Sequence, residues 1–267
     1  MKLKTKQQFR RRVNAQKEFQ RQLRLRRNLE RSLLSKLNKV FRTWLSSTLY
    51  LYREFGTFQR GVAQNRLTEE LNPVLLREYR KIFETIISSN VDLNQKEEKA
   101  EEAIIFGKVV NYEALVDEYF AGRDLVLSGI SSRLARRIDR IIQQGRSQDL
   151  TLPEIARNVQ RLLGPSIRAR ANLIARTETH NAASFANHRY YEEVADELEI
   201  TMKKRWVAVS DARTRSFHAD ANGQTVDMDD DFQVGGANMS YPGDPRGGAR
   251  NVINCRCVVV YADERDI

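Results

Sequence analysis

The sequence predicts a mainly helical protein, in which long N-terminal helices precede a small α+β module with a short antiparallel sheet. Three observations support this fold class: apolar residues recur at three- and four-residue spacing over most of residues 29–198, no glycine or proline precedes Gly56, and the helical spacing ends after Glu199. The expected parts are a basic arm at residues 1–31, a helical region at residues 32–164 and an α+β module at residues 165–267.

Apolar stripes define the helices of the middle region. Leu33, Leu37 and Trp44 lie on one stripe of a first helix, which Gly56 or Gly61 is expected to bend or end. Further helices are expected at about residues 67–88, 112–120, 124–144, 152–163 and 166–198. Apolar stripes of this width and spacing are typical of helices that pack against one another in a core.

The start and the middle of the last helical stretch carry local signals. Thr151 and Glu154 form a capping-box pattern, in which each side chain bonds the backbone N–H of the other residue. Gly164-Pro165 is expected to end the short helix that begins there, so that a separate long helix follows it.

Short strands are expected after Glu199. Residues 203–210 alternate, with Trp206 on one face and Val207 and Val209 on the other. A turn signal at residues 222–223 precedes a short strand at residues 224–226, and residues 257–261 form a final apolar strand. Residues 227–251 hold an acidic cluster, two Gly-Gly pairs and two prolines, and they are expected to form one long loop of functional importance.

The net charge of +10 is concentrated at the N-terminus. Residues 1–31 hold 12 Lys and Arg against Glu18 and Glu30, which leaves 33 basic and 33 acidic residues elsewhere. A basic segment on a neutral body indicates contact with nucleic acid or an acidic protein surface, and a solvated tail is the alternative. The candidate contacts are Lys2, Lys4, Lys6, Arg10, Arg11, Arg12, Lys17, Arg21, Arg24, Arg26 and Arg27.

Several protein classes are disfavoured by composition. No apolar run approaches the roughly 18 residues of a membrane span, so no membrane partner is expected. The basic start is not followed by the apolar region of a secretory signal. The two cysteines are one residue apart, which excludes a disulfide framework and favours maturation in a reducing cytoplasm.

Cys255 and Cys257 are a candidate metal pair. On a strand both side chains face the same way, with His218 as a third ligand and His180 or Asp211 as a fourth, which would make a zinc site. In the alternative interpretation no cofactor is bound, the thiols are small packing residues, and Arg256 between them points toward an acid such as Asp211 or Glu178. The alternative is favoured, because two cysteines and one histidine are fewer ligands than a paired Cys-x-x-Cys set supplies.

Polar residues in the same region form a second candidate group. An enzyme could use Glu178 or His218 as general acid or base, with arginines that hold an anion. A structural network that ties the long helix to a small sheet is favoured, because the sequence shows no nucleophile–base–acid order, phosphate loop or dinucleotide fingerprint. The predicted network has no catalytic member and comprises Arg176, Glu178, Thr179, Trp206, Asp211, Arg213, His218, Asn254 and Arg256.

The order of these motifs resembles that of the phage Mu F-like minor head proteins, also called the phage head morphogenesis family. The resemblance covers roughly residues 125–262 and rests on Arg176-Thr177-Glu178-Thr179, Trp206, Asp211-Ala212-Arg213-Thr214-Arg215 with His218, Gly223, Phe232, Tyr241-Pro242-Gly243-Asp244-Pro245 and Asn254-Cys255-Arg256-Cys257. Many members of this family carry further cysteines in the stretch that matches residues 211–218. Here Arg215 stands where such a cysteine is expected, which weakens the zinc interpretation.

The resemblance implies a structural protein of the virion, which acts in head assembly at or near the portal vertex and has the portal protein and other head proteins as partners. It implies a place in the capsid, and in the host cytoplasm while heads assemble. The basic residues add a possible contact with packaged DNA. The alternatives are an enzyme or toxin-like effector that uses Arg176, Glu178, Asp211 and His218, and a free DNA-binding protein.

Overall fold

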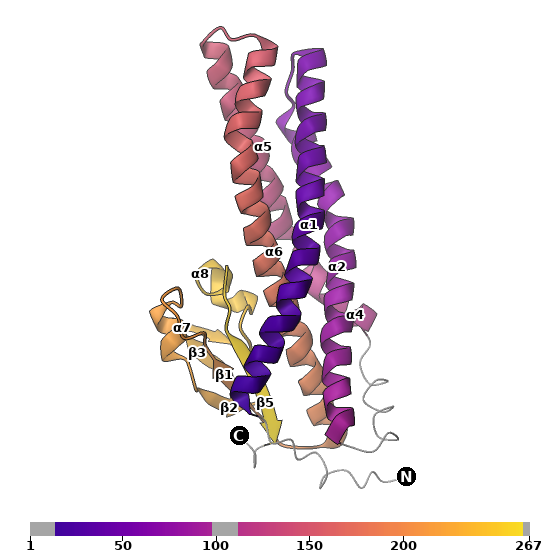
Figure 1. Cartoon of the computed structure of the whole chain (residues 1–267), viewed down its shortest axis with the longest axis vertical. Helices are drawn as coiled ribbons and strands as arrows, with labels where there is room; N and C mark the ends of the chain where they lie inside the picture. The colour runs from indigo at the N-terminus through magenta and orange to yellow at the C-terminus, as the bar shows by residue number, and fades with distance from the viewer. Residues whose placement is uncertain (1–13, 98–111, 264–267) are drawn as a thin grey trace. The chain divides into compact units, whose positions relative to one another are not determined.

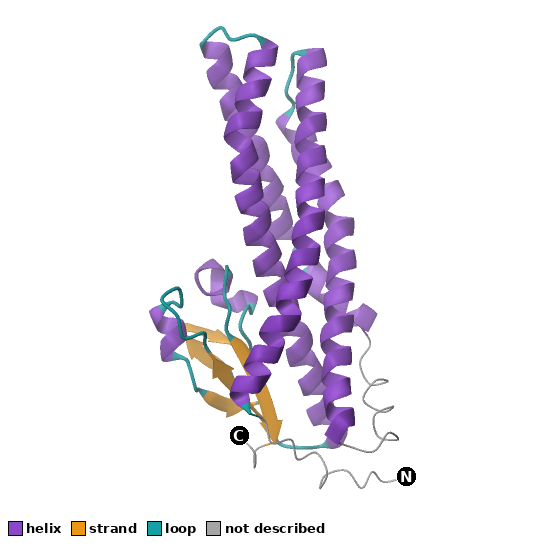
Figure 2. Cartoon of the chain, in the orientation of Figure 1, coloured by secondary structure: helices purple, strands orange, loops and turns teal. Residues whose placement is uncertain are grey.

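The structure is a computed structural model that describes residues 14–97 and 112–263 (Figure 1). Five helices account for most of it: α1 (Ala15–Phe55), α2 (Arg60–Glu97), α4 (Tyr112–Ala121), α5 (Asp124–Ser147) and α6 (Leu152–Leu198). Within the described residues, all strands lie in the C-terminal segment, after α6 (Figure 2). The predicted fold class, long helices followed by a small module with a short antiparallel sheet, is therefore confirmed.

Two compact units divide the chain, and both are discontinuous in sequence. The first holds the described residues up to Glu30, from Arg80 to Val116 and from Arg176 onward, and the second holds Arg31–Tyr79 and Asp117–Ala175. Helices α1, α2 and α6 each contribute one part to each unit. This division differs from the consecutive parts that composition predicts, because a unit boundary inside a continuous helix leaves no break in helical spacing.

The second unit is built on the apolar stripes of four helices. The side chains that fill its core are Leu33, Leu37, Phe41 and Trp44 of α1, Leu67, Leu71 and Leu75 of α2, Ile138 and Ile142 of α5, and Ile155, Val159 and Leu163 of α6. The indole Nε1 of Trp44 donates to the Ala63 carbonyl at 2.8 Å, so the largest core side chain is also satisfied. Helix α1 ends at Phe55 because Gly56 adopts a positive φ of 66°.

The predicted break at Gly164-Pro165 is wrong, because α6 runs without interruption from Leu152 to Leu198. Pro165 lies on the exposed side of the helix, where the carbonyl that loses its intrahelical bond can reach water. Leu163 and Ile167 flank it on the buried stripe. Continuous burial along that stripe offsets one missing hydrogen bond.

Half of the predicted capping box is present at the start of α6. A Glu154 carboxylate oxygen accepts from the Thr151 backbone N–H at 2.8 Å, as the pattern predicts. The Thr151 hydroxyl donates to the same carboxylate at 2.6 Å, whereas the prediction required it to accept from the Glu154 backbone N–H.

A three-stranded antiparallel sheet in the order β2-β1-β5 forms part of the first unit. Its strands are β1 (Met202–Val207), β2 (Thr225–Asp227) and β5 (Val258–Asp263). In the register, Lys204 faces Tyr261 and Trp206 faces Val259 across β1 and β5. Strand β1 alternates as predicted but ends at Val207, three residues early, since the backbone turns through residues 210–214.

The stretch predicted as one long loop contains four short elements. A hairpin of β3 (Phe232–Val234) and β4 (Ala237–Met239) is followed by η1 (Pro245–Gly247) and α8 (Gly248–Val252). Elements of three to five residues are too short to show a period, so composition alone indicated a loop.

Helix α6 is buried on every side over a stretch of the first unit. Every residue from Thr177 to His188 is buried, although this run is rich in alanine, asparagine, serine and threonine. Small side chains allow close approach of neighbouring elements around the whole helix. Phe185 contacts Phe83 of α2 and Tyr241 at ring distances of 5.7 Å and 6.0 Å.

Among the residues that the structure describes, no helix combines the length and the apolar character that crossing a membrane requires.

Candidate functional site

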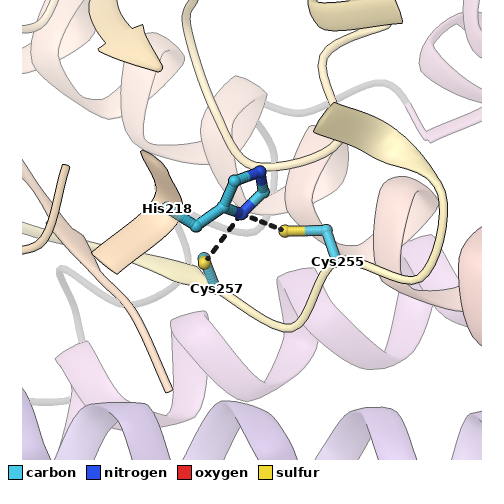
Figure 3. Close-up of side chains that lie close together, drawn as sticks. All are labelled: His218, Cys255 and Cys257. Atoms are coloured by element: carbon cyan, nitrogen blue, oxygen red, sulfur yellow. Dashed lines mark hydrogen bonds between the residues drawn. The ribbon is translucent and has the colours of Figure 1, made fainter. Parts of the chain in front are cut away.

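Three metal-ligating side chains meet in the first unit. His218 comes from the short helix α7 (Ser216–Asp220), and Cys255 and Cys257 come from the segment that leads into β5. The His218 Nδ1 lies 3.4 Å from the Cys257 Sγ and 3.6 Å from the Cys255 Sγ (Figure 3). All three residues are only 2% exposed, and their ligand atoms lie within 4.8 Å of one another. The structure therefore assembles the group of three that spacing predicts.

The backbone around the cysteines is set by Asn254. This residue has a positive φ of 61°, which asparagine tolerates better than most residues, and it reverses the chain between α8 and β5. Its backbone N–H donates to the Thr177 hydroxyl on α6 at 3.1 Å. The Trp206 ring packs edge-on against His218, with ring centres 5.8 Å apart. Helix α6 and strand β1 thereby fix the two sides of the cluster.

The two thiols have opposite pKa shifts. A hydrogen bond with Cys257, together with the His180 and His218 rings, lowers the pKa of Cys255 well below its ordinary value despite burial. The same bond to Cys255, with burial and the repulsion between two thiolates, raises the pKa of Cys257. The pair therefore holds one thiolate readily and resists a second while no cation is present.

Arg26 brings a positive charge from α1 to the edge of this cluster. Its Nη1 lies 2.8 Å from the His180 Nδ1 and 3.4 Å from the Cys257 carbonyl oxygen, and its Nη2 donates to the Gln22 side-chain oxygen at 3.1 Å. Burial lowers the pKa of Arg26 to about 10, and the charge of Cys255 opposes that effect. Arginine only donates hydrogen bonds, so His180 Nδ1 must be the acceptor.

Two other residues of the predicted network, Arg256 and Asp211, lie nearer the surface. Arg256 makes two parallel bonds of 2.6 Å to the Asp211 carboxylate, as the sequence predicted, and these bonds hold the pKa of Asp211 well below its ordinary value. Asp211 also accepts from the Arg213 backbone N–H at 3.0 Å. This ion pair joins the turn after β1 to the segment before β5.

Arg176 has partners of its own. It donates to Glu30 on α1 at 3.3 Å and to the Asn254 side-chain oxygen at 3.1 Å. Glu178 and Thr179 are buried on α6. Arg176, Asp211 and His218 thus have separate sets of partners, which fits a set of anchors better than one reactive constellation.

The predicted basic arm is not one exposed segment. Lys2, Lys4, Lys6, Arg10, Arg11 and Arg12 lie outside the described residues. Lys17, Arg24 and Arg27 are exposed on α1. Arg21 instead bonds Glu18, Ser89 and Asn90, and Arg26 is buried, so neither guanidinium is available to a phosphate. Their positions follow from the amphipathic face that α1 turns into the first unit.

Two features of the site carried no role in the sequence prediction. The first is the turn at Gly243, which has a φ of 97° and packs against Asn181 of α6. The next residue, Asp244, accepts hydrogen bonds from the backbone N–H groups of Ser240 and Arg246, at 2.8 Å and 2.9 Å. Lys204 is fully buried beside the Phe232 ring, and burial lowers its pKa to about 8. In the sequence, the burial of Lys204 is indicated only by its alternation with Met202 and Trp206, which places the three residues on the same face of the strand.

Comparisons with known proteins bear on the same segment. Residues 133–260 match the model of a family described as Phage Mu protein F like protein. The chain is 34% identical over 148 residues to NAD(+)--arginine ADP-ribosyltransferase EFV of Enterococcus faecalis, which is 55% of this chain and 30% of that protein. It is 30% identical over 135 residues to Minor head protein GP7 of Bacillus phage SPP1, which is 50% of this chain and 42% of that protein.

A third curated relative is the uncharacterized protein YqbB of Bacillus subtilis, 31% identical over 96 residues, which is 34% of this chain and 30% of that protein. The chain spans less than half the length of each of these relatives. No solved structure gives a significant match.

Proposed function

This chain is a Phage Mu F-like protein through residues 133–260, and on that premise we propose that it is a minor head protein that acts at or near the portal vertex during head assembly and DNA packaging. The observation that carries the proposal is the match to the SPP1 minor head protein, together with the family region that contains the whole cysteine–histidine site. The proposed partners are the portal protein and other head proteins.

The proposed role is structural rather than enzymatic. The ion pair of Asp211 with Arg256 and the bonds of Arg176 to Glu30 and Asn254 supply anchoring within the first unit, which needs no turnover. The name of the Enterococcus faecalis relative favours a transferase or toxin-like effector as a second candidate. The match covers 30% of that protein, and an assay for ADP-ribosyl transfer from NAD to an arginine acceptor separates the two candidates.

The second unit offers an apolar surface for a head-assembly partner. A pocket of about 340 Å³ is lined by Thr48, Leu51, Phe55, Thr57, Phe58, Gln59, Val62, Ala63 and Arg66, where α1 ends and α2 begins. Phe55 is 70% exposed and Val62 is 55% exposed beside it. Clustered exposed apolar side chains of this kind mark protein interaction sites.

We expect Phe55→Ser to weaken binding of the full chain to the portal protein of the same phage about tenfold to a hundredfold, because an exposed aromatic anchor typically contributes about 1.5–3 kcal/mol to an interface. Co-purification and calorimetric titration measure the effect. Leu162→Ser is the matched control, since Leu162 is an exposed apolar residue of the same unit that does not line the pocket. Equal weakening by both variants would exclude the pocket, and absence of any binding by the wild-type chain would count against the portal role.

The proposed DNA contact is tested through the first 13 residues, which hold six Lys and Arg and no acid. Their deletion lowers the net charge from +10 to +4, so affinity for duplex DNA should fall and the slope of log affinity against log salt should flatten by up to about 5. Fluorescence anisotropy over a salt series measures both quantities. A second variant with Lys17, Arg24 and Arg27 changed to glutamine tests the exposed face of α1. Unchanged binding in both variants would refute the DNA contact.

A further inference from the structure

We propose that His218, Cys255 and Cys257 are the three protein ligands of a zinc ion in the first unit. The site is distinct from the proposed docking surface and does not depend on the head-protein role. It ties together α7, the turn after α8 and the start of β5, which are otherwise short elements with little core of their own.

The spacing of the ligand atoms fits a tetrahedral ion. Zinc lies about 2.3 Å from a thiolate sulfur and about 2.0–2.1 Å from an imidazole nitrogen, so two such ligand atoms at a tetrahedral angle are about 3.6 Å apart. The His218 Nδ1 lies 3.4 Å and 3.6 Å from the two sulfurs. An ion can therefore be placed among these atoms with only small movements of the side chains.

The donor set and its surroundings favour zinc over other common cations. Thiolate and imidazole ligands select zinc among the abundant divalent ions, whereas calcium and magnesium prefer oxygen. All three side chains are buried, so their desolvation is already complete before the ion binds. A divalent cation also removes the repulsion that opposes a second thiolate beside the first.

His180 is not placed to act as the fourth ligand. Its Nδ1 accepts from Arg26 at 2.8 Å, so in the neutral ring the proton sits on Nε2, which then has no lone pair for a metal. Asp211, the other candidate from the sequence, is held by Arg256. Neither residue therefore supplies a fourth ligand in this arrangement.

Arg215 does not belong to the cluster. Its side chain is directed to the backbone, where its Nη2 donates to the Ile253 carbonyl. It therefore fixes the turn before Cys255 from outside the cluster. The group of potential ligands therefore consists of His218, Cys255 and Cys257.

The experiment uses the full chain, purified under reducing conditions without chelator, supplied with zinc and then desalted. Mass spectrometry for metals should find about one zinc per chain. Cobalt substitution should give the intense visible bands of a tetrahedral site and near-ultraviolet thiolate charge transfer. Cys257→Ser should lose both signals, and a chelator should expose the two thiols of the wild-type protein to a thiol reagent.

His188→Gln is the matched control, because His188 is a buried histidine of the same unit that contacts Tyr261 rather than the cysteines. It should keep the full zinc content. His180→Gln should keep the ion, whereas a ligand role for His180 would abolish binding. If Cys257→Ser fails to fold, the cobalt spectrum of the wild-type protein decides alone. Folded, reduced wild-type protein that holds no zinc, or zinc that is retained equally in Cys257→Ser, overturns the proposal.

Discussion

Replacing Gly243 with alanine should destabilise the first unit by about 2–5 kcal/mol, the largest effect we expect from a single added methyl group. Two costs add. The φ of 97° is strained for a residue with a side chain, and a Cβ would lie 3.0 Å from the Cγ and 3.1 Å from the Cα of Asn181, and closer still to its Oδ1. The close backbone approach of this turn to α6 is possible only without a side chain. Chemical denaturation measures the change.

Gly236→Ala separates the two costs. Gly236 also has a positive φ, of 80°, but no atom lies within 4 Å of the Cβ that would be added. The Gly236→Ala variant should therefore lose only about 1–2 kcal/mol of the free energy of unfolding. Asn181→Ala in the Gly243→Ala background removes the side chain that clashes and should restore part of the loss. Equal losses for the two glycine variants would show that the contact with α6 contributes nothing.

Arg26→Ala should destabilise the first unit by about 3–5 kcal/mol. Three buried acceptors lose their donor at once: His180 Nδ1, the Cys257 carbonyl and the Gln22 side-chain oxygen. A cavity remains where the guanidinium was packed. The midpoint of urea unfolding, followed by a probe in this unit, measures the effect.

Arg24→Ala is the control for charge and helix propensity, because Arg24 is exposed on the same turn of α1. It should change stability by no more than about 0.5 kcal/mol. Arg26→Lys should lose an amount of stability between those of Arg26→Ala and Arg24→Ala, since an ammonium cannot reproduce the planar guanidinium that contacts three acceptors. If Arg26→Ala and Arg24→Ala unfold at the same urea concentration, the buried contacts do not stabilise the fold.

The sequence predicted the features that depend on local spacing. The stripe from Leu33 to Trp44 follows from a period of 3.6. The preference of glycine for positive φ left Gly56 and Gly61 as candidates for the end or bend of α1, and the helix ends before Gly56. The alternation along a strand turned Arg256 toward Asp211 or Glu178, and it pairs with Asp211. Residue type and spacing also indicate His218, Cys255 and Cys257 as a candidate metal group, although they favour a packing role for the two thiols. These features can be predicted from local patterns because each depends only on residues that are near in sequence or on one neighbouring segment.

Features that depend on distant packing were missed. Arg26 looks like any other residue of a basic run, and only the fold reveals that it faces His180 rather than solvent. Pro165 was expected to separate two helices, but α6 continues through it, because burial of the apolar stripe on the other side of α6 outweighs one lost hydrogen bond. The short elements of residues 227–251 are held by contacts such as Asp244 with Ser240 rather than by periodicity.

The discontinuous make-up of the first unit has a consequence for synthesis of the chain. The Gln22 side chain near the N-terminus donates to the Val259 carbonyl at 3.0 Å, across 237 positions of sequence. A ribosome that adds about 5–20 residues per second needs on the order of 10–50 seconds to bridge that separation. During this interval the apolar face at the start of α1 cannot pack against β5. It therefore stays accessible to chaperones and to other nascent chains until both ends of the sequence are available to form the core.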